Sequence, residues 1–243
     1  MPSFTGEITA LESPIDVMYL MHKVFMDHSI KTERLALDVL QGGELGELKE
    51  AVGEWLNHIL YHVDTEDVFL TGPLKEKTLP DGRMVVKDNV AEHDQIRLGG
   101  EHVLNNFSRN TRQESAEFSR DLILALDDQK HVELMEKVED LQRAIEKVLT
   151  EDDLRIRSRK YLYRSVLALK VTEFDHFENE EASVLPLIKE QMSRNEQLEC
   201  ARKLLFQDSA AHSGWIFDFI LNGLCESERI LLQDLRKEID ARL

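Results

Sequence analysis

Apolar residues along this chain recur mostly at intervals of three and four, which is the spacing of amphipathic α-helices. The pattern predicts a first helix that opens at the Ser-Pro pair at positions 13 and 14 and ends at the two glycines at 42 and 43. It predicts a second helix over about residues 44–70, which the Gly-Pro pair at 72 and 73 ends. Each helix has one apolar face, so each is expected to pack against other helices.

The remainder of the chain continues the helical pattern with interruptions. A Pro-Asp-Gly turn marks residues 78–89 as a loop or small hairpin, and a third helix is expected over about residues 90–103. Residues 107–149 are interpreted as an inserted helical pair, which is either a structural brace or a lid or dimer surface. A further helix is expected from about residue 150 to 181, and the tail offers two or three more.

These elements predict an all-α protein, because no strand alternates with the helices as in a parallel sheet. We expect an up-down four-helix bundle over residues 1–190, with residues 107–149 inserted into it. Residues 191–243 are expected to form a helical extension packed on the bundle.

Composition narrows the class of protein. Hydrophobic residues make up 42% of the chain, which is enough to bury a core. The formal charge of -17 repels phosphate backbones and anionic lipids, so nucleic acid and membrane surfaces are not expected as partners. The chain shows neither a membrane span nor a secretory signal. Its two cysteines, Cys200 and Cys225, do not suit a disulfide scaffold or an iron–sulfur cluster, and the expected compartment is the cytoplasm.

Two pairs of residues carry the most informative chemistry. His62 and Glu66 lie four positions apart in the second helix, and His176 and Glu180 have the same spacing further along. Residues four apart on a helix share one face, one turn from each other. An imidazole and a carboxylate placed in this way can bind the same metal ion, or one ion and its neighbour.

Two further histidines, His22 and His93, continue the apolar stripes of the first and third helices and are expected to point inward. A single inward histidine is usually a hydrogen-bonded core residue. Four imidazoles from four helices, accompanied by two carboxylates, would be costly to bury without a cation. Because the core of a helical bundle can hold a metal pair, we predict a metal site.

With these residues the chain resembles the hemerythrin family, in the branch known for its His-His-Glu signature. The resemblance covers about residues 13–186 and rests on His22, on Asn57 to His62 continuing to Glu66, on Glu92-His93-Asp94, and on His176 to Glu180 followed by Glu181 and Pro186. It implies a four-helix bundle of the hemerythrin type with a non-haem centre of two irons. It also implies that Glu66 and Glu180 bridge the irons and that His22, His62, His93 and His176 are terminal ligands.

The third helix departs from the pattern of the oxygen carriers in this family, which usually have two histidines four apart there. Position 97 is Arg and position 89 is Asn, so His93 stands alone. The pattern is more similar to the branch that includes iron- and oxygen-sensing domains and bacterial peroxide-handling proteins. One fewer imidazole implies a more open coordination position, which argues against simple reversible oxygen carriage.

The other histidines are assigned from their helical phase. His58 shares the stripe of His62, so it is either a neighbour that orients the ligands or a spare ligand. His28 lies off the face of His22, and His102 lies on the side opposite His93. Structural or surface roles are expected for His131 and His212.

Three functions are compatible with these residues. In the first, the di-iron centre binds dioxygen or reports iron status. In the second, the same centre belongs to an enzyme that activates oxygen or decomposes peroxide. In the third, the bundle holds zinc or no metal. The resemblance supports the first most directly, with dioxygen or peroxide as the partner and a homodimer as a further candidate assembly.

Overall fold

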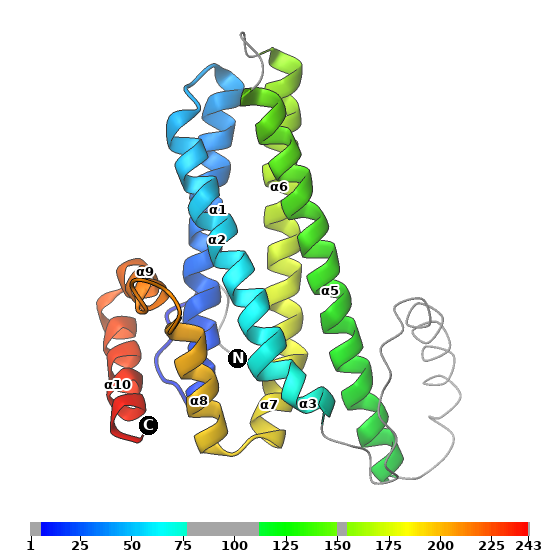
Figure 1. Ribbon diagram of the computed structural model, residues 1–243, viewed down its shortest axis with the longest axis vertical. Helices are drawn as coiled ribbons and strands as arrows, with labels where there is room; N and C mark the ends of the chain where they lie inside the picture. Colours follow the sequence, from blue (N-terminus) through cyan, green and yellow to red (C-terminus); the bar gives the residue numbers. More distant parts are fainter. Residues whose placement is uncertain (1–5, 77–111, 150–154, 243) are drawn as a thin grey trace.

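The computed structural model describes residues 6–76, 112–149 and 155–242. Within these residues every regular element is a helix, which confirms the predicted all-α class. Four long helices lie side by side and alternate in direction (Figure 1): α1 (Val17–Gln41), α2 (Gly46–Glu66), α5 (Arg112–Leu149) and α6 (Ile156–Asn179). The expected loop over 78–89 and the expected third helix over 90–103 lie outside the described residues.

The first helix begins and ends as its sequence predicts. The backbone N–H of Ser13 donates to Oδ2 of Asp16 at 2.9 Å, and a short 3-10 turn, η1 (Pro14–Asp16), leads into α1. Gly42, with φ at +117°, terminates the helix in the left-handed conformation that a glycine adopts without a steric penalty.

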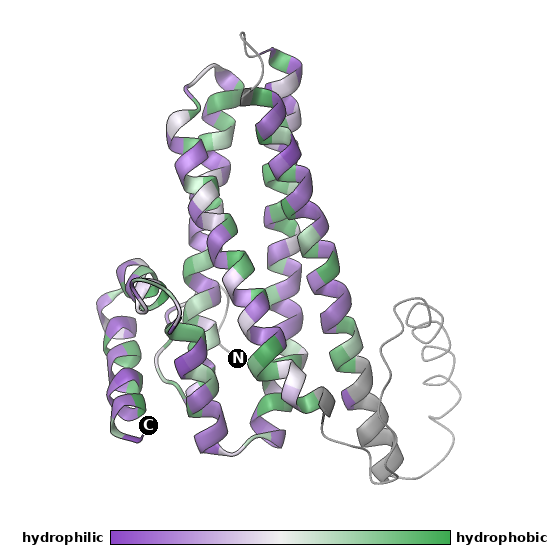
Figure 2. Cartoon of the chain, in the orientation of Figure 1, coloured by the Kyte–Doolittle hydropathy of each residue, from purple (hydrophilic) through white to green (hydrophobic). Residues whose placement is uncertain are grey.

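The described core has two parts. The first lies among the four long helices and contains Trp55, Leu141 and Val166. The second extends from the start of α1 towards the C-terminal helices and contains Met18 and Ile216. Figure 2 shows hydrophilic and hydrophobic residues alternating around the helices, as amphipathic packing requires. None of the described helices has an apolar stretch that could cross a bilayer.

Helix α5 corrects one prediction. The helical pair expected over residues 107–149 is wrong for residues 112–149, because these form one continuous helix. This helix packs along α6, and its apolar stripe, which includes Leu134, Val138 and Val148, is buried in the core of the four long helices. The stripe keeps its helical spacing with no Gly or Pro to interrupt it, so the helix is part of the four-helix arrangement and not a brace outside it.

The end of α2 also differs from the prediction, because Gly72 and Pro73 do not stop the helical path. A π-helical turn, η2 (Asp67–Thr71), follows α2 and leads into the short helix α3 (Gly72–Glu76). Pro73 has no N–H to donate to the carbonyl of Phe69, four residues earlier. The thiol of Cys200 donates to this carbonyl at 3.2 Å instead. The carbonyl of Phe69 therefore has a hydrogen-bond donor although Pro73 offers none.

Helix α6 ends in the same manner. A second π-helical turn, η3 (Glu180–Val184), leads into α7 (Leu185–Gln191), whose first turn contains Pro186. A π-helical turn inserts one extra residue into the helical path, and such turns are frequent at functional sites. Both turns in this protein begin at or directly after a glutamate of the predicted metal site.

Three helices follow at the C-terminus: α8 (Arg194–Leu205), α9 (Trp215–Gly223) and α10 (Glu226–Arg242). Helix α8 contacts η1, α2 and η2, whereas α9 and α10 contact α1. They cover the part of α1 and α2 that carries the predicted ligands (Figure 1). Gly223 permits this contact, because a Cβ at this position would lie 2.5 Å from a methyl group of Val24.

Candidate metal centre

The four long helices bring acidic and imidazole side chains together in the interior. All of these side chains are buried: His22 from α1, His62 and Glu66 from α2, Asp127 and His131 from α5, and His176 and Glu180 from the end of α6 and the start of η3. We call this set the buried cluster. It contains four imidazoles and three carboxylates, which is an exceptional concentration of ionisable groups for a protein core.

Glu180 occupies the middle of the buried cluster. Its Oε2 lies 2.9 Å from Nε2 of His22, and its Oε1 lies 2.9 Å from Nε2 of His176 and 3.3 Å from Nε2 of His62. One carboxylate is thus surrounded by imidazole nitrogens from three helices. A carboxylate with ligand groups on both oxygens is well placed to join two metal ions.

Glu66 is the second carboxylate of the interior. Its Oε2 lies 3.4 Å from Nε2 of His131 and 3.8 Å from Nε2 of His62. Two overlapping groups of ligand atoms result, and in each group all atoms lie within 4.8 Å of one another. One group consists of His62, Glu66, His176 and Glu180, and the other of Asp127, His131, His176 and Glu180. The buried cluster can therefore hold a metal ion.

The outer nitrogens of two imidazoles have acidic partners. Nδ1 of His22 lies 2.9 Å from Oε1 of Glu181, and Nδ1 of His131 lies 3.2 Å from Oδ1 of Asp67. In both rings Nε2 is the atom that faces the carboxylates of the interior. The ring of His22 also stacks on Phe177, with 4.1 Å between the ring centres, which fixes its plane.

In the metal-free protein the pKa values of Glu66 and Glu180 are shifted in opposite directions. Burial raises the pKa of Glu66 well above its ordinary value, and the negative charges of Glu180 and Asp127 raise it further. Burial opposes ionisation of Glu180 too, but the imidazoles of His176 and His62 outweigh it and hold its pKa well below the ordinary value. In the metal-free interior the ionised form is therefore favoured for Glu180 and disfavoured for Glu66.

The pKa values of the imidazoles are also shifted in opposite directions. Burial lowers the pKa of His62 to about 4, so this ring is neutral. For His22 and His131 burial also opposes the charge, but the neighbouring carboxylates prevail and raise the pKa to about 9 and about 11. The protonated rings of His22 and His131 therefore supply positive charge beside the carboxylates of the metal-free cluster.

Several buried polar atoms have no hydrogen-bond partner among the described residues. They include both carboxylate oxygens of Glu66, Nδ1 of His62, and both ring nitrogens of His176. Unsatisfied buried polar groups destabilise a fold, and a bound cation would satisfy the carboxylate oxygens of Glu66 and one nitrogen of His176. The donor set of imidazoles and carboxylates, without thiolate, suits iron, manganese or zinc.

The structure brings together five of the six residues that the sequence singles out: His22, His62, Glu66, His176 and Glu180. His93 lies outside the described residues. His131, on the third of the four long helices, also lies in the buried cluster, with Asp127 four residues before it. Of the two roles expected for His131, the surface role is wrong because the side chain is buried. The signal was present, because Asp127 and His131 repeat the spacing of four on the apolar face between Leu124 and Leu134.

The remaining described histidines lie outside the buried cluster. The ring of His58 stacks on Phe219 with 3.7 Å between the ring centres, and its Nδ1 contacts the carbonyl of Glu54. Nε2 of His28 contacts the carbonyl of Ala51 on the neighbouring helix at 2.9 Å, and His212 is exposed. His58 therefore packs towards α9, one helical turn away from the ligands.

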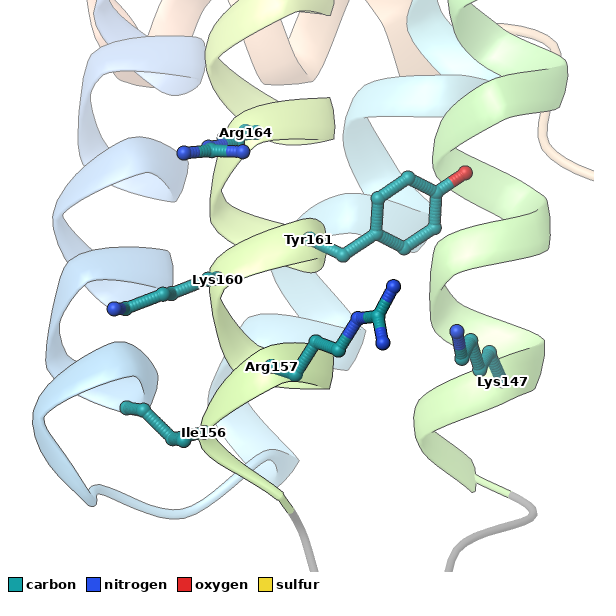
Figure 3. A pocket seen from close by; sticks show the side chains of 6 residues that line it. All are labelled: Lys147, Ile156, Arg157, Lys160, Tyr161 and Arg164. Atoms are coloured by element: carbon teal, nitrogen blue, oxygen red, sulfur yellow. The ribbon is translucent and has the colours of Figure 1, made fainter.

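A basic hollow of the described surface lies elsewhere. Lys147, Arg157, Lys160, Tyr161 and Arg164, with Ile156, line a cavity of about 570 Å³ between the end of α5 and the start of α6 (Figure 3). The twelve residues of helix from position 164 to 176 correspond to about 18 Å. This hollow therefore does not border the buried cluster, and we do not assign it to the same site.

No family model, curated protein or solved structure matches the chain. The resemblance to the hemerythrin family therefore stays a prediction from the residues of this chain.

Proposed function

We propose that this chain is a hemerythrin-like protein that holds two non-haem irons and interacts with dioxygen or peroxide. The observation that carries the proposal is the overlap of the two ligand groups, which share His176 and Glu180. One ion would be held by His22 and His62 and the other by Asp127, His131 and His176. Glu66 and Glu180 would bridge them, since each carboxylate has imidazole nitrogens of both sets within 4 Å.

Charge balance supports two divalent ions in preference to one. The carboxylates of Glu66, Asp127 and Glu180, together with that of Glu181 beside His22, carry four negative charges when all are ionised, and two divalent cations carry four positive charges. In the metal-free protein the protonated rings of His22 and His131 provide part of this balance. Two cations would replace these protons, ionise Glu66 and leave the interior close to neutral.

The setting of the cluster favours a small oxidant as the partner. A pair of ferrous ions supplies two electrons, which is what the reduction of dioxygen to peroxide, or of peroxide to water, requires. His22, Glu66, His176 and Glu180 are fully buried, and the basic hollow between α5 and α6 is lined by residues outside the cluster. A diatomic molecule or hydrogen peroxide fits such a setting better than an organic substrate does.

The direct test is anaerobic reconstitution with ferrous iron. We expect about two irons per chain after removal of unbound metal, and a visible absorption band of a diferric centre after exposure to air or peroxide. One tightly bound zinc with no uptake of iron would overturn the proposal. His58→Phe is a matched control, because it changes a buried histidine outside the cluster.

The second candidate is an enzyme that activates oxygen or decomposes peroxide with the same centre. Repeated cycles of oxygenation and deoxygenation, followed by stopped-flow absorbance, separate the two functions. Return to the diferrous state on removal of oxygen identifies a binding or sensing protein. Sustained consumption of peroxide over many equivalents identifies an enzyme.

A further inference from the structure

The two π-helical turns repeat one local pattern on α2 and α6. Each has a histidine, a glutamate four residues later, and an acidic residue directly after the glutamate: His62, Glu66 and Asp67 in one copy, His176, Glu180 and Glu181 in the other. A proline follows six or seven residues after the glutamate in each copy. Both acidic residues lie in the π-helical turn.

Each acidic residue contacts an imidazole from a different helix. Asp67 contacts Nδ1 of His131 from α5, and Glu181 contacts Nδ1 of His22 from α1. The other nitrogen of each ring, Nε2, faces the glutamate that directly precedes the acidic residue: Glu66 for His131 and Glu180 for His22. Two adjacent carboxylates thus hold the two nitrogens of one imidazole, and the chain builds this arrangement twice.

A neutral imidazole carries one proton, so it offers a lone pair from only one nitrogen. A carboxylate that accepts the Nδ1–H fixes the proton on that atom, leaves the lone pair of Nε2 for a metal, and makes the ring a stronger ligand. We propose that Asp67 and Glu181 are positioning residues of the metal centre, which hold His131 and His22 in the tautomer and orientation that bind metal through Nε2. This inference rests on the proposed function.

The π-helical turns explain how neighbouring residues reach the same ring. Adjacent side chains of an α-helix diverge by about 100°, and the extra residue in a π-helical turn reduces this angle. The turn after α2 is closed by a bond from the N–H of Gly72 to the carbonyl of Asp67, and the one after α6 by a bond from Leu185 to Glu180. Both turns therefore begin where the two carboxylates must converge.

The two acidic residues, Glu181 and Asp67, are not equally shielded from solvent. The side chain of Glu181 is 11% exposed and its contact is 2.9 Å long, whereas that of Asp67 is 45% exposed and its contact is 3.2 Å long. Water screens an exposed charge, so Glu181 is expected to have the larger effect on its ring. Loss of Glu181 should weaken the ion bound by His22 more than loss of Asp67 weakens the ion bound by His131.

The test uses zinc and cobalt(II), titrated into the metal-free protein against a chromophoric chelator. Glu181→Gln keeps an acceptor for Nδ1–H but removes the charge, and Glu181→Ala removes both. We expect affinity for one of the two ions to fall in that order, by about 10- to 100-fold for Glu181→Ala. Asp67→Asn should have a smaller effect, on the other ion. Glu178→Ala and Asp64→Asn, which change exposed acids on the same two helices, are the matched controls.

A spectroscopic readout separates positioning from a general structural role. In the zinc-loaded protein, proton NMR should show a slowly exchanging Nδ1–H of His22, shifted downfield by Glu181, and this signal should be lost in Glu181→Ala. Metal affinities of Glu181→Ala and Glu178→Ala that agree within twofold would overturn the inference while leaving the proposed function intact. Failure of the wild-type protein to bind a second ion would instead overturn the proposed function.

Discussion

Nε2 of His22 lies 2.9 Å from Oε2 of Glu180, and neither side chain has any exposed surface. In the metal-free protein this contact is an ion pair, since the pKa of His22 is raised to about 9 despite burial. A metal ion would take the place of the proton between the two atoms. The contact would therefore differ between the metal-free and the metal-bound states.

The first prediction concerns this glutamate. Glu180→Gln removes the charge that two metal ions would share, so we expect the metal content after ferrous reconstitution to fall from about two irons per chain to less than one. Metal analysis after desalting measures this. Glu178→Gln, at an exposed position two residues earlier, should retain the wild-type content. Two irons in Glu180→Gln would show that this carboxylate is not a bridge.

The second prediction concerns the histidine of α5. His131→Ala should remove one of the two irons or weaken its binding by at least about tenfold, because the ring faces Glu66 at 3.4 Å. His58→Phe, which replaces another buried histidine, should leave both irons bound. Equal metal content in the two variants would place the third-helix ligand elsewhere in the chain, and His93 would then be the next residue to test.

A comparison of His93 with His131 shows which features of the site helical periodicity predicts and which it does not. Helical periodicity identifies the inward face of each segment, and it places His22, His62, Glu66, His176 and Glu180 correctly on that face. It does not identify which segment packs beside which. The stripes containing His93 and His131 are equivalent in this respect, and His93 is singled out because the Glu92-His93-Asp94 motif belongs to the family resemblance.

The π-helical turns could not be predicted for a different reason. A Gly-Pro pair normally ends a helix, so the sequence predicts that the helical path stops at Gly72 and Pro73. The continuation depends on contacts distant in sequence, such as the thiol of Cys200 on the carbonyl of Phe69. The contacts of Asp67 and Glu181 with imidazoles therefore could not be predicted from the helical pattern alone.

The third prediction tests the turn after α2 through its glycine. A Cβ at Gly72 would lie 2.4 Å from the carbonyl oxygen of Asp67, which is a backbone atom that cannot move without opening the turn. Gly72→Ala should lower the free energy of unfolding by about 1–3 kcal/mol, measured by urea denaturation. Gly53→Ala is the matched control. No atom lies within 4 Å of its Cβ, so it should stabilise the protein by up to about 1 kcal/mol.

The fourth prediction is a pH dependence that belongs to His58. Burial lowers its pKa to about 4 from an ordinary 6.5, so the ring must be neutral in the folded protein. Its contribution to stability is complete above pH 6.5 and is lost as the pH falls towards 4. Metal-free wild type should therefore lose about 2 kcal/mol between pH 6.5 and 5 relative to His58→Phe. Parallel stability curves for the two proteins would contradict this assignment.

The last prediction concerns Glu173, a fully buried acid one turn before His176. Its Oε1 accepts the indole N–H of Trp55 at 2.7 Å. Burial outweighs the hydrogen bonds from Trp55 and Ser29 and raises its pKa to about 8, so the carboxyl group holds its proton in the folded protein at neutral pH. Unfolding at pH 7 must release this proton, because the ordinary pKa is 4.5.

The direction in which stability changes with pH follows from the difference between the folded and the ordinary pKa of Glu173. A raised pKa contributes stability that is complete below pH 4.5 and is lost as the pH rises through 8. Glu173→Gln keeps an acceptor for Trp55 but has no proton to lose, so its stability relative to wild type should grow by about 2–4 kcal/mol between pH 5 and 8. Urea denaturation of the metal-free proteins across this range measures the difference. Asp175→Asn, at an exposed neighbouring position, should follow the wild-type curve. A constant difference between Glu173→Gln and wild type would mean that Glu173 is ionised in the fold, and the interior beside the buried cluster would then carry one more negative charge for a metal to balance.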